Sequence, residues 1–211
     1  MHAFTPPFPD RTRPELRGSF GMAASTHYLA TAAANSVLER GGNAADAAVA
    51  AAFVLHVVEP HLNGPGGDLT ALIAPAGEEP YVLAGQGTAP AAATIEHYRG
   101  LGLDEVPGAG PLAAAVPGAV VAWLHLLATR GTWEVRDVLA FARDLARDGH
   151  PVHENVTRVI ERVTSLFTEH WPTSAEQWLV DGAAPAPQSR VTNAAYAALL
   201  NGMIAAGEQS D

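Results

Sequence analysis

The feature that most constrains this chain is a nearly unbroken apolar stretch, AADAAVAAAFVLHVV, that follows Asn43. Two glycines at 41–42 precede it and are typical of a helix end, and a proline closes it. Asn43 can cap a helix here, with Asp46 in capping-box position. Because a helix that is apolar on all sides is buried, we predict a central helix. Its alanines would allow close packing, so leucine at Ala48 or Ala51 should overpack it, whereas leucine at Ala205 should be tolerated.

Further along the chain, short apolar runs alternate with helical patterns, which predicts an α+β fold. Residues 69–74 and 81–84 form a plausible hairpin around a turn at 75–80. Other short strands are expected at 19–25 and 113–116. Helices are expected at 28–40, 91–100 (with Thr94 as its cap), 117–129, 135–147, 154–167 and 194–206, and residues 182–190 are linker-like.

Composition narrows the possible partners. The chain has 211 residues, enough for one sizeable domain, with 48% hydrophobic and 16% charged residues. A net charge of −10 argues against a nucleic-acid partner. The absence of cysteine excludes disulfides and thiolate chemistry. His150 and His153 are separated by a proline, and no carboxylate completes a ligand set at useful spacing. We therefore expect no metal and no cofactor.

The N-terminal segment, residues 1–17, carries four prolines and three arginines, which predicts an extended arm. Such an arm can lie across a neighbouring subunit or form a disordered tail, and both possibilities stay open. The segment lacks the apolar core of a signal peptide. Asp46, His56 and Glu59 interrupt the longest apolar run before it reaches membrane-spanning length. A soluble, cytoplasmic protein without a membrane partner is the expectation.

Three motifs, in order, carry a resemblance to a known family: GGNAADAAVAAAFVLHVVEPHLNGPGG at 41–67, TAPAAAT at 88–94 and AVPG at 115–118. In this order and spacing they resemble the N-terminal, large-subunit region of the γ-glutamyltranspeptidase family. The resemblance implies that residues 18–211 form the N-terminal part of a large subunit. It further implies the helical layer and a partial sheet of an αββα N-terminal-nucleophile hydrolase fold, incomplete in this chain.

The resemblance also implies a function. Family members hydrolyse or transfer a γ-glutamyl or related acyl group through a covalent threonine ester, as in glutathione metabolism. That threonine becomes an N-terminus by self-cleavage, and its segment would lie beyond this chain. We therefore expect the chain alone to be inactive and to be an N-terminal fragment whose partner is the missing C-terminal, small-subunit part. A homo-oligomer acting on a small γ-glutamyl or acyl-amide substrate is also expected.

Two candidate site features follow from the resemblance. The turn Asn63–Asp68 follows a helix and lacks a third glycine, so it is no dinucleotide fingerprint. It is a tight turn that, by resemblance, shapes the pocket through Gly64, Gly66 and Gly67. Gln86 stands where relatives carry an arginine that grips a substrate carboxylate. A glutamine amide cannot form that bidentate ionic pair, so another arginine serves or the substrate lacks a free glutamyl α-carboxylate. A solvent-facing turn glutamine is equally open.

The other polar residues are expected to have structural rather than chemical roles. Thr26-His27 resembles the family's nucleophile segment but precedes the first helix, where we predict that Thr26 is an N-cap. His56 is expected to be a core histidine, and Asp144, Asp148, Glu161 and Glu169 to form a solvated face.

Two alternatives to the transferase remain. One is an inactive scaffold or interaction domain, and the other is an amide acylase acting on a non-glutamyl group.

Overall fold

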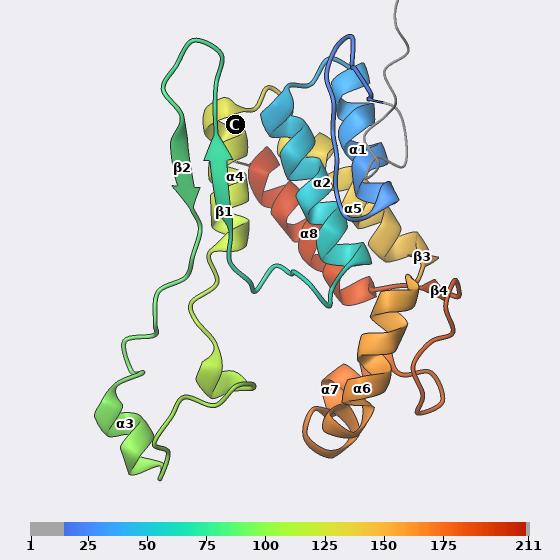
Figure 1. Cartoon of the computed structure of the whole chain (residues 1–211). Helices are drawn as coiled ribbons and strands as arrows, with labels where there is room; N and C mark the ends of the chain where they lie inside the picture. The colour runs from blue at the N-terminus through green and yellow to red at the C-terminus, as the bar shows by residue number, and fades with distance from the viewer. Residues whose placement is uncertain (1–14, 210–211) are drawn as a thin grey trace, which may run out of the picture.

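The computed structural model describes residues 15–209, so most of the predicted N-terminal arm lies outside the described residues. The chain forms a helical core with small hairpins and two projecting segments (Figure 1). The elements, in order, are α1 (Tyr28–Glu39), α2 (Ala44–Val58), β1 (Thr70–Ile73), β2 (Tyr81–Ala84), α3 (Ile95–Gly100), the 3-10 turn η1 (Pro111–Ala113), α4 (Ala119–Arg130), α5 (Val135–Asp148), β3 (His150–Pro151), α6 (Glu154–His170), α7 (Pro172–Trp178), β4 (Arg190–Val191) and α8 (Ala194–Glu208). The predicted α+β class is confirmed.

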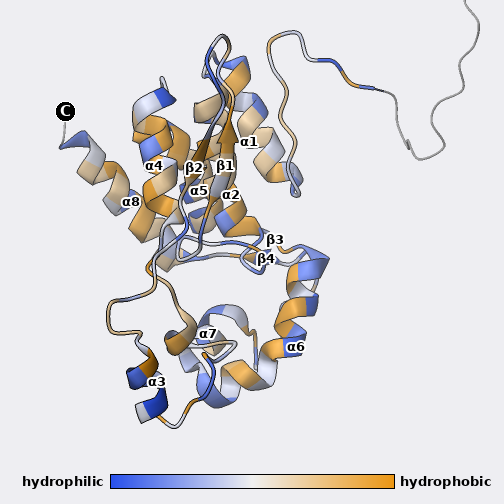
Figure 2. Ribbon diagram, turned by 60° about the vertical axis from the view of Figure 1, so that its left-hand side comes forward, coloured by the Kyte–Doolittle hydropathy of each residue, from blue (hydrophilic) through white to orange (hydrophobic). Residues whose placement is uncertain are grey.

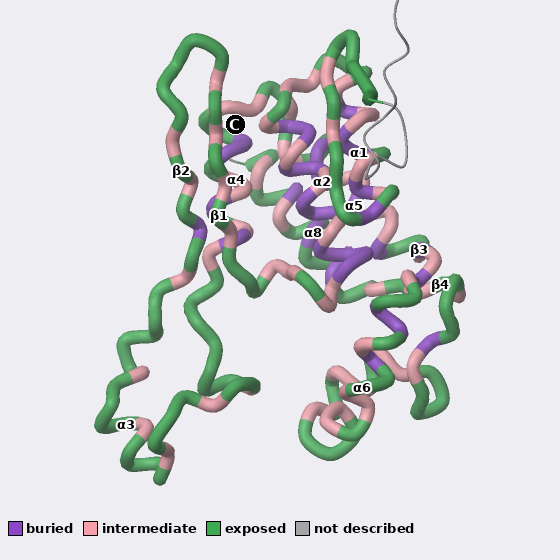
Figure 3. The backbone as a smooth tube through the Cα atoms, in the orientation of Figure 1, coloured by how far each residue is buried: buried purple, intermediate pink, exposed green. Residues whose placement is uncertain are grey.

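Helix α2 is the centre of the core, as its apolar sequence predicts. It packs against α1, α4 and α5, and α5 packs in turn against α8. Phe53, Val49 and Val54 of α2 are completely buried, as are Leu139 of α5 and Leu200 of α8. Figure 3 shows the buried positions gathered on these helices. A polar contact joins α2 to α8 inside this core, where the ring of His56 lies 3.1 Å from the Tyr196 hydroxyl.

The alanines of α2 divide between two faces. Ala47 and Ala50 are buried against neighbouring helices, with Ala50 fully enclosed. Ala48 and Ala51, which the sequence placed in the tightest packing, are only half-buried and line open grooves instead. Ala51 still packs against the edge of the core, so the most buried alanines of α2 are Ala47 and Ala50, and overpacking at Ala48 and Ala51 stays a prediction from the sequence. The exposed position predicted for Ala205 is confirmed.

The start of α2 is fixed by the predicted capping box. The Asn43 side chain accepts from the backbone N–H of Ala45 and Asp46 at 2.8 and 3.1 Å, and the Asp46 carboxylate accepts from the Asn43 N–H at 2.8 Å. Asp46 also accepts from the N–H and hydroxyl of Thr132, at 2.8 and 2.7 Å, and from the Trp133 N–H at 3.1 Å. One buried carboxylate therefore ties the helix to the α4–α5 loop.

Strands β1 and β2 form the predicted antiparallel hairpin, with Leu72 opposite Val82. Ile73 and Leu83 pack against the helical core, because alternate residues of a strand face one way. Leu72 and Val82 face the other way, and 72% and 62% of their surfaces are exposed. The predicted strands at 19–25 and 113–116 are wrong, because neither segment finds a ladder partner among residues 15–209.

A smaller lobe of α6 and α7 has its own hydrophobic cluster. Val152, Val156 and Ile160 are buried there, with Trp178 packed beside them. Figure 2 shows α6 and α7 set apart from the helical core, with hydrophobic and hydrophilic positions alternating around α6. His150-Pro151, expected only to end a helix, pairs with β4. No helix within residues 15–209 is long and apolar enough to cross a membrane.

Candidate functional site

The glycine turn and the segment after β2 meet at the open end of the hairpin. Leu69, just after the turn, exchanges two backbone hydrogen bonds with Gly85, one of 3.2 Å from the Leu69 N–H and one of 2.7 Å from the Gly85 N–H. The turn itself is closed by a bond of 3.0 Å from the Gly67 N–H to the Gly64 carbonyl. The pairing therefore holds the turn beside residues 85–88, although the two segments are distant in sequence.

The AVPG segment joins them from a third direction. The N–H groups of Gly118 and Ala119, which open α4, both donate to the Gly67 carbonyl at 3.2 Å. The Val116 N–H donates to the Thr88 carbonyl at 2.9 Å. Residues 64–69, 85–88 and 115–119 thus converge through their backbones, and we call this convergence the glycine junction.

Two glycines at the junction are required by the closeness of these backbones. A Cβ added to Gly118 would lie 2.2 Å from the Gly85 carbonyl oxygen, and one added to Gly87 would lie 1.6 Å from the Val116 carbonyl oxygen. Real side chains do not approach backbone oxygens so closely, so neither position has room for one. By contrast, a Cβ on Gly64 or Gly66 would meet nothing within 4 Å. The turn's outer glycines therefore face open space, and their role in shaping a pocket stays a prediction.

Gln86 lies at the glycine junction with its side chain exposed, between Gly85 and Gly87. An amide can donate and accept hydrogen bonds, but it carries no charge to balance a carboxylate. The structure thus places Gln86 and the predicted glycines of the turn in one region. Which backbone groups join them could not be predicted from the motifs, because those bonds depend on the fold.

Two grooves flank α2. The first, with a volume of about 440 Å³, lies between α2 and β1, and Leu72 and Ile73 are among its lining residues. The second, of similar volume at about 440 Å³, lies between α2 and residues 20–24. Ala44 and Ala48 line both grooves, so the alanine face of α2 is their common floor. This small-residue face is therefore open to solvent along both grooves.

The residue that caps α1 is His27, not the predicted Thr26. The His27 ring accepts from the Leu29 N–H at 3.2 Å, whereas the Thr26 hydroxyl donates to the buried Glu59 carboxylate. Thr26 lies within the chain and has no free α-amino group, which an N-terminal nucleophile uses as its base. The prediction that Thr26 is non-catalytic does not depend on the cap and stands as a prediction.

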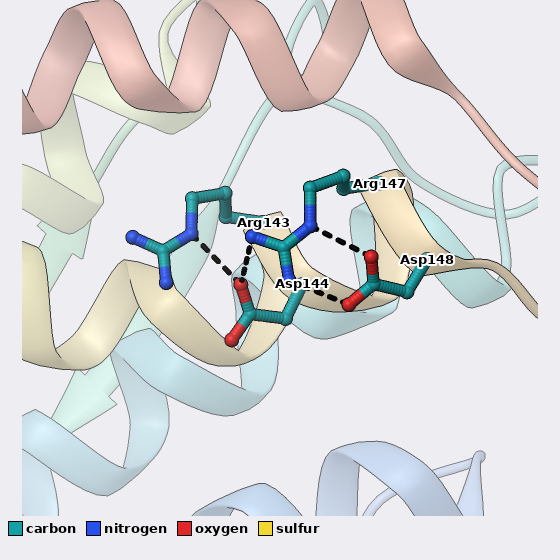
Figure 4. Close-up of polar contacts among 4 residues, drawn as sticks. All are labelled: Arg143, Asp144, Arg147 and Asp148. Carbon is teal, nitrogen blue, oxygen red and sulfur yellow. Dashed lines mark hydrogen bonds and ion pairs between the residues drawn. The ribbon is translucent and has the colours of Figure 1, made fainter.

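No three His, Asp or Glu side chains among residues 15–209 form a metal-ligand set. His56 is the predicted core histidine, and burial lowers its pKa to about 4. Figure 4 shows Asp144 and Asp148 in a row of ion pairs along α5 with Arg143 and Arg147, at distances of 2.5 to 3.1 Å. Exposed pairs of this kind contribute little to stability.

Comparison with known proteins identifies the fold. The sequence profile described as Gamma-glutamyltranspeptidase matches residues 30–210. The chain belongs to the γ-glutamyltranspeptidase family. The oxamate amidohydrolase proenzyme of Klebsiella pneumoniae subsp. pneumoniae is 37% identical over 201 residues, which cover 90% of this chain and 37% of that protein. The acylase ACY 1 proenzyme of Pseudomonas sp. strain SE83 is 36% identical, covering 90% and 36%.

Similar solved structures agree with this assignment. LmbA2991HD superposes with a TM-score of 0.89 at 57% identity, covering 92% of this chain and 33% of that one. The γ-glutamyltranspeptidase of Helicobacter pylori superposes with a TM-score of 0.85 at 28% identity, covering 92% and 56%. The predicted N-terminal-nucleophile hydrolase fold is therefore confirmed, and this chain spans little more than a third of the curated relatives named above.

Proposed function

We propose that this chain is the N-terminal part of a γ-glutamyltranspeptidase-family amidohydrolase, whose threonine nucleophile lies outside residues 1–211. The observation that carries the proposal is the glycine junction, where three family motifs converge through backbone bonds beside an exposed Gln86. A nucleophilic threonine would attack the substrate amide, form an acyl ester and release the amine, and water or an acceptor amine would then remove the acyl group. The chain's own part is to hold one wall of the pocket.

The open surfaces support a partner from the same proenzyme. The alanine face of α2 lies between two grooves, and the hairpin presents Leu72 and Val82 to solvent. A two-stranded hairpin with an exposed apolar face is marginal by itself and calls for further strands or a second layer. Relatives named proenzymes are much longer than this chain. In this proposal the remainder of the protein covers these surfaces, and the isolated chain is inactive.

A second candidate concerns the acyl group. Gln86 offers no charge to a substrate carboxylate, so an amide whose acyl part lacks a free glutamyl α-carboxylate fits the junction better than a γ-glutamyl compound. Relatives at 37% and 36% identity are named as an oxamate amidohydrolase and an acylase, but another at 36% is named as glutathione hydrolase-like, so the choice depends on the uncharged Gln86. We place γ-glutamyl transfer second for that reason.

The test compares the complete proenzyme with Gln86→Arg, on a γ-glutamyl anilide and on amides without an α-carboxylate. The parent is expected to prefer the latter, and Gln86→Arg to shift kcat/KM toward the γ-glutamyl compound by about tenfold or more, since charge-assisted pairs exceed neutral ones. Gln209→Arg, at an exposed position just after α8, is the matched charge control. A parent that prefers the γ-glutamyl anilide overturns the choice of acyl group. No activity on any amide would favour the inactive scaffold.

A further inference from the structure

Two helices that meet at one junction are both capped by histidine. His27 is the N-cap of α1, and its Nδ1 accepts from the Leu29 N–H at 3.2 Å. His153 is the N-cap of α6, and its Nδ1 accepts from the Asn155 N–H at 3.1 Å. The two rings lie edge to face with their centroids 5.9 Å apart. The caps that begin α1 and α6 are therefore direct neighbours, although the residues are far apart in sequence.

Histidine differs from other capping residues because it can lose its acceptor. In both rings Nδ1 accepts a hydrogen bond, so the proton of the neutral ring is on Nε2. Protonation converts Nδ1 into a donor, and an imidazolium has no acceptor nitrogen left. It also places a positive charge at the positive end of a helix dipole. A proton on either ring thus removes one cap and opposes the helix that the ring begins.

One carboxylate balances such a charge in part. His27 is buried and stacks on Tyr28, with centroids 4.7 Å apart. Glu59, at the end of α2, is the carboxylate that acts on His27, and it already accepts from the Thr26 hydroxyl.

Two more histidines share the junction, namely His61 after α2 and His150 in β3. His153 and Glu59 act electrostatically on His61, and His27 acts on His150. The Nδ1 atoms of His61 and His150 are buried without a hydrogen-bond partner. The junction therefore gathers four histidines from four parts of the chain, and the Glu59 carboxylate acts on two of them, His27 and His61.

We propose that the His27–His153 pair is an acid-sensitive latch between the helical core and the α6–α7 lobe. Neutral rings cap α1 and α6 together and hold the lobe at the core, and protonated rings uncap both helices and repel each other. The lobe can respond separately because Val152, Val156 and Ile160 form a hydrophobic cluster distinct from that of the core. The latch is a property of the fold and does not depend on the proposed enzymatic activity.

The direction of the pH effect follows from burial. Burial lowers the pKa of His27, partly offset by Glu59, and has the same effect on His61. It lowers the pKa of His150 to about 4. These pKa values lie below the ordinary value of 6.5, so the unfolded junction binds more protons than the closed one. The closed latch is thus unaffected above about pH 6.5 and loses stability as the pH falls below that value.

Hydrogen exchange of the complete protein at pH 7.5 and pH 5.0, corrected for intrinsic rates, tests the latch. Protection in the first turns of α1 and α6 is expected to fall at pH 5.0 by about fivefold per cap. Asn caps helices through an oxygen that does not titrate, so His27→Asn and His153→Asn should remove this fall and keep the protection at pH 7.5. His125→Asn, exposed on α4, is the matched control and should behave as the parent.

Two results would overturn the latch. One is an equal loss of protection at pH 5.0 in the parent and in His153→Asn, whose half-buried position makes it the safer variant for folding. The other is a ring ¹⁵N spectrum at pH 7.5 in which His27 and His153 carry their protons on Nδ1, because such rings could not accept the capping bonds.

Discussion

The helical core and the segment that follows the hairpin are built in opposite ways. In the core, α1, α2, α5 and α8 bury one another's apolar residues, with Val49, Phe53 and Leu200 fully enclosed. From residue 86 to residue 118 no residue is buried, and Ile95 and Val106 are 65% and 58% exposed (Figure 3). These helices therefore enclose the apolar core within this chain, whereas the hairpin and residues 86–118 expose apolar side chains. Stability should therefore depend on the first region, and assembly on the second.

The largest expected effect is at Asp46, whose carboxylate accepts four hydrogen bonds, one from Asn43, two from Thr132 and one from Trp133. Its own N–H donates a further bond to the Asn43 side chain. Asp46→Ala leaves the N–H groups of the α4–α5 loop without partners, and the free energy of unfolding should fall by about 3 kcal/mol or more. Urea denaturation measures this change. Asp137→Asn, an exposed acidic residue in the first turn of α5, should stay within about 0.5 kcal/mol. Equal effects of the two substitutions would contradict the role given to Asp46.

Two alanines of α2, one buried in the core and one lining the open grooves, test the same contrast between core and open surface. Ala50 has no exposed surface, so Ala50→Leu should overpack the core and lower the free energy of unfolding by about 1–3 kcal/mol. Ala48→Leu enters a groove and should cost less than about 0.5 kcal/mol in the isolated chain, like Ala205→Leu. In the complete protein, Ala48→Leu should instead impair assembly. A cost at Ala48 equal to that at Ala50, measured in urea, would mean that the α2 grooves are not open.

The core also carries a pH dependence, through His56. Burial lowers its pKa to about 4, against 6.5 when exposed, so the unfolded chain gains protons first as the pH falls. The contribution of His56 is constant above about pH 6.5 and should fall by about 2 kcal/mol between pH 7 and pH 5. Replacing both partners, His56→Phe with Tyr196→Phe, removes this dependence without leaving a buried group unpaired. Denaturation midpoints that fall equally with pH in both proteins would contradict it.

The smallest effect on stability, but a clear one on association, is expected from the hairpin. Leu72→Thr with Val82→Thr changes only exposed side chains and should alter the free energy of unfolding by less than about 0.5 kcal/mol. The parent chain, with its apolar strand face uncovered, should associate, and the variant should do so less. Sedimentation velocity of the isolated chain measures the difference. A parent that remains a clean monomer without binding hydrophobic dye would show that the hairpin needs no cover.

Local patterns predicted most of the helices, the hairpin and the caps at Asn43 and Thr94, because capping and periodicity depend on neighbouring residues. The cap of α1 was missed because His27 is a less usual capping residue than the adjacent threonine. The expected strand at 113–116 failed because strands need partners, which a local pattern does not provide. The glycine junction could be anticipated as three motifs but not as one place, because the bonds between them join residues up to about 50 positions apart.

The tight crossing at the glycine junction has a consequence for engineering. Gly87 and Gly118 cannot accept a methyl group without separating the backbones, and a Cβ on Gly85 would lie 2.5 Å from that of Ala122. Gln86 is thus a variable position between fixed neighbours. A library aimed at changing substrate range should randomise residue 86 and leave 85 and 87 as glycine. Most variants at position 86 should then fold, so that differences in turnover report on recognition of the acyl group.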